Sequence, residues 1–205
     1  MTDERSLIEV ILLKSKAIKD VALKFFTIHG YEGASLSQIA EELGMRKQSL
    51  YAHFKGKDDL FLQVLQDAKE TELSSKLDYL RKVDAQNPKA ALLGYLQLVI
   101  HLFQKNEKLK FWLRMSYFPP QHLAKAIDKE VLDTENKIQT VLESKFHQWI
   151  DSEIIIEEDA LIPTLAFSGI VDSIMVELAY GNDEKRLHDK LNASWIVFWR
   201  GISRL

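Results

Sequence analysis

The chain has 205 residues, of which 46% are hydrophobic, with 8 Gly, 4 Pro and a net charge of −3. Such a chain can bury a core, and its scarcity of Gly and Pro argues against turn-rich all-β folds and disordered chains. The sequence lacks Cys, which excludes disulfide scaffolds, cysteine-ligated zinc and thiol catalysis and agrees with a cytoplasmic location. No apolar run approaches the ~20 residues that span a membrane, so no membrane partner is expected.

Apolar residues recur at helical spacing along nearly the whole chain, which predicts an all-α fold of about nine helices. A domain boundary is expected near Phe61, inside a continuous helix, so that residues 1–60 form one domain and residues 61–205 a second. The predicted helices cover residues 5–29, 35–43, 47–54, 57–83, 88–104, 108–117, 121–150, 158–180 and 184–204.

The segment 35–54 has the features of a helix-turn-helix. Ser35 is a good N-cap for the second predicted helix, with Gln38 as its capping-box partner. Ala40 and Gly44 are four residues apart, a spacing that suits a close helix approach followed by a tight turn. The same spacing also fits a plain helical hairpin with a solvated basic face.

The third predicted helix carries polar side chains on one side. If Leu50 and Phe54 face inward, Lys47, Gln48 and Tyr51 share the outer face. Residues 43–57 include four basic residues and no acid, a local charge that suits DNA phosphates. These features predict a helix that fits the major groove of DNA.

A larger set of residues between positions 14 and 65 follows one known pattern: Ile18, Ala22, Phe26, Gly30, Tyr31, Ser35, Ile39, Ala40, Gly44, Leu50, Tyr51, Phe54, Lys55, Lys57, Asp59 and Leu60. With this set the sequence resembles the tetracycline-repressor-like (TetR) family of bacterial regulators. The resemblance implies an N-terminal three-helix DNA-binding domain and a C-terminal helical domain for ligand binding and dimerisation. It also implies a homodimer that binds double-stranded DNA at a palindromic operator, usually as a repressor.

Two positions depart from the family's common pattern. Arg46 stands where the third helix usually has a hydroxyl N-cap, and Gln48 replaces the usual small residue. Arginine is a hydrogen-bond donor and a cation, so it caps a helix N-terminus poorly. Arg46 therefore either contacts a phosphate or a guanine, or stays solvated because Gly44 and Met45 hold the turn.

The predicted DNA contacts divide by chemistry. Lys47 and Gln48 are expected to read bases, whereas Tyr51, His53 and Lys57 are expected to contact phosphates, with surface or packing roles as the alternatives. Hydroxyl groups at the start of the second helix either cap it or also bind a phosphate. The full predicted set is Ser35, Ser37, Arg46, Lys47, Gln48, Ser49, Tyr51, His53, Lys55 and Lys57.

A ligand site is predicted beside the short helix 108–117, because the equivalent helix of the TetR family lies beside its ligand pocket. Asp172 lies in an otherwise apolar helix and either pairs with Arg114 or Lys145 or faces the pocket and selects a cation. For Glu177, near the end of the same helix, the alternative to a partner is solvent exposure. The predicted ligand-binding set is Phe103, Trp112, Met115, Phe118, Phe167 and Asp172.

The last two helices carry more large apolar side chains than one core can hold. This excess predicts a four-helix interface between two copies of the chain. The alternative is that these side chains seal the protomer's own core. The predicted interface set is Val171, Ile174, Leu178, Trp195, Phe198, Trp199 and Ile202.

Motifs for catalysis, metal binding and nucleotide binding are absent from the sequence, including His-Glu-x-x-His and Gly-x-Gly-x-x-Gly, so no enzyme, metal or cofactor is expected. The predicted function is a ligand-responsive DNA-binding transcriptional regulator, a repressor that a small, largely apolar effector releases from its operator. The alternative is an all-α binding or adaptor module that no longer reads DNA.

Overall fold

The computed structural model describes residues 2–84, 86–156, 158–181 and 183–204, with side chains from residue 9 onward. Within these ranges the chain forms nine α-helices and one short 3-10 helix, and its β-pairing is limited to a single bridge between Ile155 and Ser203. The all-α prediction is therefore confirmed. The chain divides into two compact units, Met1–Glu70 and Thr71–Leu205. This division falls at residue 70 rather than 60, but still inside a helix.

The first unit contains α1 (Thr2–Gly33), α2 (Leu36–Glu42), α3 (Lys47–Leu50) and the first part of α4 (Lys57–Lys82). Aromatic rings lie at the centre of its core. The rings of Phe26 and Phe61 meet edge to face, with centroids 5.0 Å apart. The buried side chains of this unit include Ile18, Ala22, Phe26, Ile39, Leu50, Phe54, Leu60 and Phe61.

Helix α1 is interrupted near its end. Gly30 has φ 69° and ψ 178°, a backbone conformation that glycine adopts without the steric cost of a Cβ atom. The helix was predicted to stop here, and the structure places a break at this residue. However, the chain resumes helical geometry as far as Gly33.

Helix α3 is shorter than predicted. It ends at Leu50 rather than at Phe54, and residues 51–53 form a turn. The Leu50 carbonyl accepts hydrogen bonds from the amides of both His53 and Phe54, at 2.9 Å each. This mixture of 3-10 and α bonds tightens the last turn while Phe54 still reaches the core.

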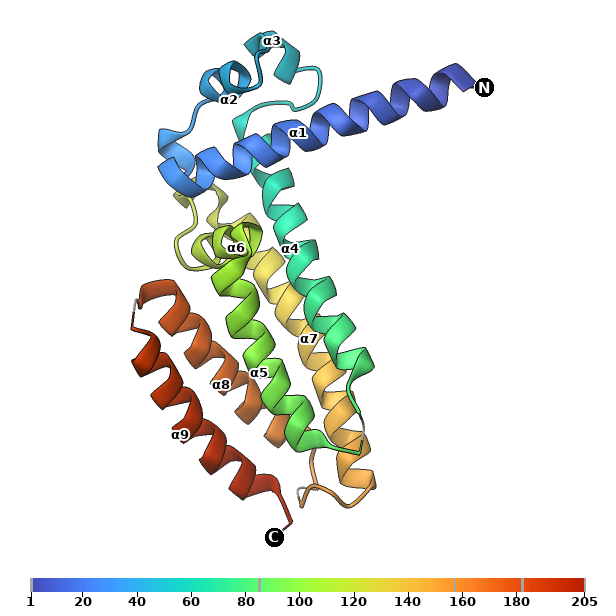
Figure 1. Cartoon of the computed structure of the whole chain (residues 1–205), viewed down its shortest axis with the longest axis vertical. Helices are drawn as coiled ribbons and strands as arrows, with labels where there is room; N and C mark the ends of the chain where they lie inside the picture. Colours follow the sequence, from blue (N-terminus) through green and yellow to red (C-terminus); the bar gives the residue numbers. More distant parts are fainter. Residues whose placement is uncertain (1, 85, 157, 182, 205) are drawn as a thin grey trace. The chain divides into compact units, whose positions relative to one another are not determined.

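The second unit contains the rest of α4, α5 (Pro88–Lys105), α6 (Glu107–Tyr117), α7 (Ala124–Asp151), α8 (Leu161–Tyr180) and α9 (Glu184–Ile202). A 3-10 turn, Gln121–Leu123, precedes α7. Helices α8 and α9 lie side by side and run in opposite directions (Figure 1). Helix α8 also contacts α5, α6 and α7.

Phe167 of α8 is the centre of the second unit's core. Its fully buried ring lies 5.8 Å from the ring of Tyr95 on α5, 6.4 Å from Phe146 on α7 and 5.7 Å from Phe198 on α9. One aromatic side chain therefore joins four helices. Among the described residues, α8 alone is long and apolar enough to cross a membrane, a test that core helices also pass.

Candidate functional sites

The start of α2 has the predicted capping box. The Gln38 amide donates to Ser35 Oγ at 3.2 Å, and the Ser35 amide donates to Gln38 Oε1 at 3.0 Å. The helix N-terminus is thus satisfied by its own residues. Ser37, two residues further on, is exposed.

The turn between α2 and α3 depends on Gly44, which has φ 63°. The Gly44 amide donates to the Glu41 carbonyl, and the Met45 amide donates to the Ala40 carbonyl, both at 2.9 Å. Ala40 itself is buried. The small residue and the glycine therefore have the places expected of them in a helix-turn-helix.

Helix α3 presents its polar side chains to solvent. Leu50 and Phe54 are buried, whereas Lys47, Gln48 and Tyr51 are exposed, as the spacing predicted. Arg46 occupies the N-cap position, and its side chain makes no capping hydrogen bond. We define the α2–α3 surface as the exposed residues Ser37, Arg46, Lys47, Gln48, Tyr51 and Lys55. Three of these six side chains, those of Arg46, Lys47 and Lys55, are cations.

Lys57 lies at the start of α4 beside an aromatic ring. Its Nζ is 4.2 Å from the centroid of Tyr31 and 3.5 Å from the Glu32 carbonyl oxygen. The Tyr31 hydroxyl in turn donates to Asp58. Burial and this hydrogen bond raise the pKa of Tyr31, so the phenol stays protonated. Lys57 and the remaining predicted contacts, Ser49 and His53, are half-buried.

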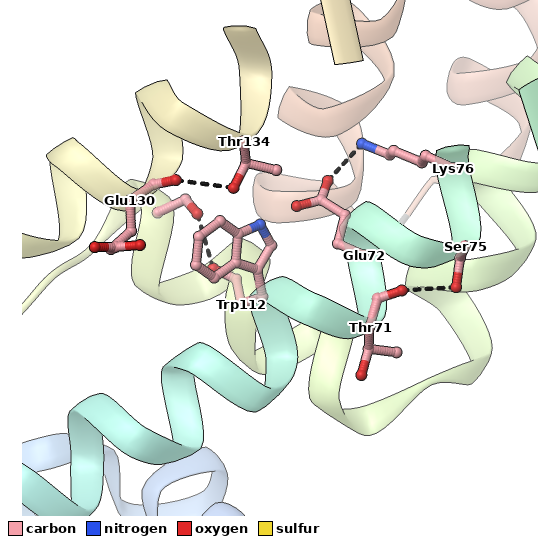
Figure 2. Close-up of polar contacts among 8 residues, drawn as sticks. Thr71, Glu72, Ser75, Lys76, Trp112, Glu130 and Thr134 are labelled. Atoms are coloured by element: carbon pink, nitrogen blue, oxygen red, sulfur yellow. Dashed lines mark hydrogen bonds and ion pairs between the residues drawn. The ribbon is translucent and has the colours of Figure 1, made fainter. Parts of the chain in front are cut away.

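The second unit holds a cavity of about 490 Å³, within the size range of small-molecule sites. Five helices line it: α4, α5, α6, α7 and α8. Figure 2 shows the indole ring of Trp112 in the space between Thr134 of α7 and Glu72 of α4. We call this space the central cavity; its polar and aromatic lining consists of Glu72, Lys76, Tyr95, Trp112, Ser116, Tyr117, Thr134, Glu135, Gln139, Ser168 and Asp172.

An ion pair on α4 forms one wall of the central cavity. Lys76 donates to Glu72 one turn earlier, and the two side chains are 5% and 4% exposed. The Lys76 Nζ also lies 5.4 Å from the ring centroid of Phe103. Burial alone would lower the pKa of Lys76, but the charge and hydrogen bond of Glu72, together with Tyr95 and Glu135, outweigh it and the pKa is raised. Lys76 is therefore charged at neutral pH.

Two further acids line the cavity without such a partner. Within the described part of the chain, neither Glu135 nor Asp172 forms an ion pair, so the suggested pairing of Asp172 with Arg114 or Lys145 is not present. Both residues are exposed overall, yet the partial desolvation of their carboxyls raises the pKa of each; for Glu135 the charges of Asp172 and Glu72 raise it further, and Lys76 acts in the opposite direction on both. The site thus disfavours their ionised forms unless a cation neutralises them.

A second, wider hollow of about 830 Å³ lies elsewhere in the same unit and is open to solvent. Phe103 and Phe118 border it, as does Glu177. Glu177 is buried and forms ion pairs with Lys190 and, at 3.2 Å, with Arg186. The hydrogen bond from Lys190 lowers the pKa of Glu177. The solvent exposure considered for this residue is therefore wrong, because α9 brings two cations to it.

Comparisons with known proteins agree with this geometry. Residues 18–64 match the family model described as bacterial regulatory proteins, tetR family. The N-terminal segment of the chain is therefore similar to that of the TetR family of bacterial regulatory proteins. It is 31% identical to the HTH-type transcriptional regulator AcrR of Shigella flexneri over 87 residues, 42% of this chain and 39% of the relative. It is 31% identical to the HTH-type transcriptional repressor ComR of Escherichia coli K12 over 91 residues, 44% and 43% of the two chains.

These matches span about two fifths of the curated relatives' length. Solved structures extend the likeness in fold to nearly the whole chain. A TetR transcription regulator from Haloarcula marismortui has a TM-score of 0.72 at 19% identity, covering 93% of this chain and 98% of its own. AibR, crystallised with isovaleryl coenzyme A and operator DNA, has a TM-score of 0.63 at 20% identity, covering 89% and 96%.

The lining of the central cavity differs from the predicted ligand set. Trp112 and Asp172 line the central cavity, whereas Met115 and Phe167 are buried in the core, and Phe103 and Phe118 border the wider hollow instead. The physical reason is helix phase: the α6 residues that line the cavity run from Trp112 through Ser116 and Leu113 to Tyr117, and Met115 lies about 60° outside this arc, beyond Trp112. The sequence analysis missed Tyr95, Tyr117, Glu135, Glu72 and Lys76.

The residues of the predicted dimer interface differ in their exposure within the protomer. Ile174, Trp195, Phe198 and Ile202 are buried within the protomer, and Val171, Leu178 and Trp199 are half-buried. The large rings fill the protomer's own core, which was the alternative reading. A different stripe of small and aliphatic side chains on the same helices is exposed. We call it the α8–α9 face: Ile162, Leu165, Ala166, Gly169 and Val176 on α8, with Ala193, Ile196 and Val197 on α9.

Proposed function

We propose that this chain is a ligand-responsive repressor that binds operator DNA through the α2–α3 surface. The observation that carries the proposal is the polarity of α3, with Lys47, Gln48 and Tyr51 exposed above a buried Leu50 and Phe54. A helix held by such a core can enter the major groove with its polar side chains toward the bases. Lys55 and Arg46 flank it and supply charge for the phosphates.

Individual roles follow from the geometry. Lys47 and Gln48 are the base-reading candidates, because both extend from the first turn of α3 into solvent. Tyr51 and Ser37 supply hydroxyl groups for phosphates. Ser35 serves α2 as its cap, and Lys57 is available for a phosphate only by leaving the Tyr31 ring. Arg46 is free of any capping role and can reach a phosphate.

A homodimer is the second part of the proposal. The α8–α9 face exposes Ile162 at 56%, Leu165 at 51% and Val197 at 74%, and apolar groups on one such stripe gain by burial against a second copy. Its glycine and alanine positions allow two helix pairs to approach closely. A symmetric four-helix bundle would bury the α8–α9 face of both copies. A two-fold dimer in turn favours a palindromic operator.

Release by a ligand is the third part. Glu72 and Lys76 in the central cavity and Lys57 beside the α2–α3 surface belong to one helix, α4. A ligand that contacts these α4 side chains more favourably in one conformation shifts the protein toward that conformation. The AibR complex holds isovaleryl coenzyme A, but at 20% identity the effector of this chain has to be inferred from its own cavity.

Fluorescence anisotropy tests the DNA-binding part. The DNA is a labelled fragment from the intergenic region next to the chain's own gene, and the unlabelled competitor is of unrelated sequence. We expect specific binding with a steep dependence on salt, because several phosphate contacts release counterions. An adaptor module that no longer reads DNA would instead bind both fragments alike and weakly.

A further inference from the structure

The charge of the central cavity is unusual for a site of its size. Three carboxylates, those of Glu72, Glu135 and Asp172, line it together with one ammonium, that of Lys76. The formal sum is −2. Glu72 is already paired with Lys76, so the two negative charges in excess are those of Glu135 on α7 and Asp172 on α8.

The cavity also contains buried polar groups that the protein leaves unused. Tyr95 is 1% exposed and Trp112 3% exposed, yet within the described residues neither the Tyr95 hydroxyl nor the Trp112 indole nitrogen has a hydrogen-bond partner. Neither atom is sealed off from solvent. Burial raises the pKa of Tyr95 to about 12, so its hydroxyl remains a neutral donor and acceptor. Such groups are normally satisfied, and a ligand or water in the cavity can satisfy both.

The ring faces supply the apolar part of the site. Trp112, Tyr95 and Tyr117 line the cavity with Val131, Ile138 and Leu142. Aromatic faces carry negative electrostatic potential and attract cations. The ring faces and the two unpaired carboxylates therefore both favour a positively charged ligand. An anionic ligand would meet both the carboxylates and the ring faces unfavourably.

From this arrangement we infer that the central cavity binds an organic cation with an aromatic or branched apolar body, its positive charge lying between Glu135 and Asp172. The inference rests on the proposed ligand-responsive function and narrows it to one chemical class. Glu72 and Lys76 remain paired with each other, and Tyr95 and Trp112 are positioned to hydrogen-bond a polar group of the ligand.

Two probes of the same shape and opposite charge test the inference: tetraphenylphosphonium and tetraphenylborate. Both are titrated into the full-length protein at pH 7.5, and binding is measured by calorimetry and by quenching of tryptophan fluorescence. We expect the cation to bind about tenfold more tightly than the anion or better, as one gained ion pair requires. Equal affinities, or tighter binding of the anion, would overturn the inference.

Substitutions test whether Glu135 and Asp172 cause the preference for the cation. Glu135→Gln with Asp172→Asn should reduce the preference for the cation to about threefold or less, since only the ring faces then discriminate. The matched control is Asp189→Asn, which removes an exposed carboxylate of α9 that pairs with Lys185 outside the cavity; it should leave the preference unchanged. A thermal melt confirms that each variant is folded. A preference that survives the double substitution, or that falls equally in the control, would contradict the proposed site.

A pH series gives a second readout that folding defects do not mimic. Tetraphenylphosphonium has no titrating proton, so any change in its affinity comes from the protein. The charged or titratable groups that face the site are Glu72 and Lys76 on α4, Tyr95 on α5, Tyr117 on α6, Glu135 on α7 and Asp172 on α8. Burial raises the pKa of Tyr95 and Tyr117, and Lys76 keeps its proton. The affinity should therefore fall as pH decreases toward the raised pKa values of Glu135 and Asp172, because the two carboxylates become protonated.

DNA binding separates this inference from the proposed function. If the unliganded protein binds its operator but does not prefer the cation, the inference fails and the function stands. If the cation is preferred but the protein never binds DNA, the site stands and the function fails.

Discussion

The ammonium of Lys76 lies against the carboxylate of Glu72 one helical turn earlier on α4, with both side chains about 95% buried. From the sequence, such a pair at i and i+4 is indistinguishable from a surface ion pair. In the structure it borders the central cavity, where either charge alone would be costly.

Removing one partner of this pair should therefore destabilise the protein. Lys76→Met leaves Glu72 charged and unpaired, and we expect a loss of about 3 kcal/mol in the free energy of unfolding, measured by urea denaturation. The control is Lys185→Met, because Lys185 pairs with Asp189 on the exposed side of α9. That change should cost less than about 0.5 kcal/mol. Similar losses for the two variants would show that the buried pair has no special role.

Removing an unpaired acid of the central cavity should have the opposite effect and stabilise the protein. The folded protein raises the pKa of Asp172, so its proton is held more tightly in the folded than in the unfolded state. The ionised form therefore lowers stability as pH rises above the unfolded pKa of about 3.9. Asp172→Asn should raise the melting temperature of the ligand-free protein at pH 7.5 but not at pH 4. Calorimetric scans at the two pH values measure this, and a variant less stable at pH 7.5 would contradict the assignment.

Base reading by α3 predicts a loss of sequence discrimination. Lys47→Ala and Gln48→Ala should each reduce the preference for the operator over unrelated DNA by about 1–3 kcal/mol. Electrophoretic shift with both DNA sequences measures the preference. Glu42→Ala, an exposed substitution at the end of α2, serves as the control. Operator preference that is intact in Lys47→Ala would remove that residue from base reading.

Lys57 should behave differently from these residues. Its contact is expected to be with a phosphate, so Lys57→Ala should weaken binding to every sequence alike and reduce the slope of log affinity against log salt by about 1. A salt titration on two unrelated DNA fragments tests this. An unchanged slope would show that Lys57 stays with the Tyr31 ring instead.

The α8–α9 face makes a prediction about assembly. An interface of the obligate kind buries about 2,000 Å² or more, and a charge at its centre should prevent it. Val197→Glu should therefore sediment as a monomer at micromolar concentration, whereas the wild type sediments as a dimer. Lys185→Glu, at the polar start of α9, should remain dimeric. A dimeric Val197→Glu would place the interface elsewhere.

The sequence was sufficient to predict the first unit and its outward residues. Ser35, Gly44, Leu50 and Phe54 act within a few positions of one another, so local spacing determines which side chains are exposed. The lining of the central cavity could not be predicted in this way. Tyr95 and Glu135 meet there only because five helices cross at particular angles, and no local pattern records those angles.

The predicted dimer residues also show that local sequence does not determine which side chains are exposed. Large apolar side chains such as Trp195 and Phe198 suggested an interface, but size alone does not tell a core position from an exposed one. The exposed stripe instead contains residues of modest size, among them Val197 and Ile162, which composition does not single out.

Footprinting of the DNA next to the chain's own gene tests whether α3 recognises an operator sequence. The wild-type protein should protect a short inverted repeat, and the protected sequence should be lost in the Lys47→Ala, Gln48→Ala double variant while that variant stays folded and dimeric. The account would be contradicted by the same footprint from both proteins, or by no protection from the wild type at low salt.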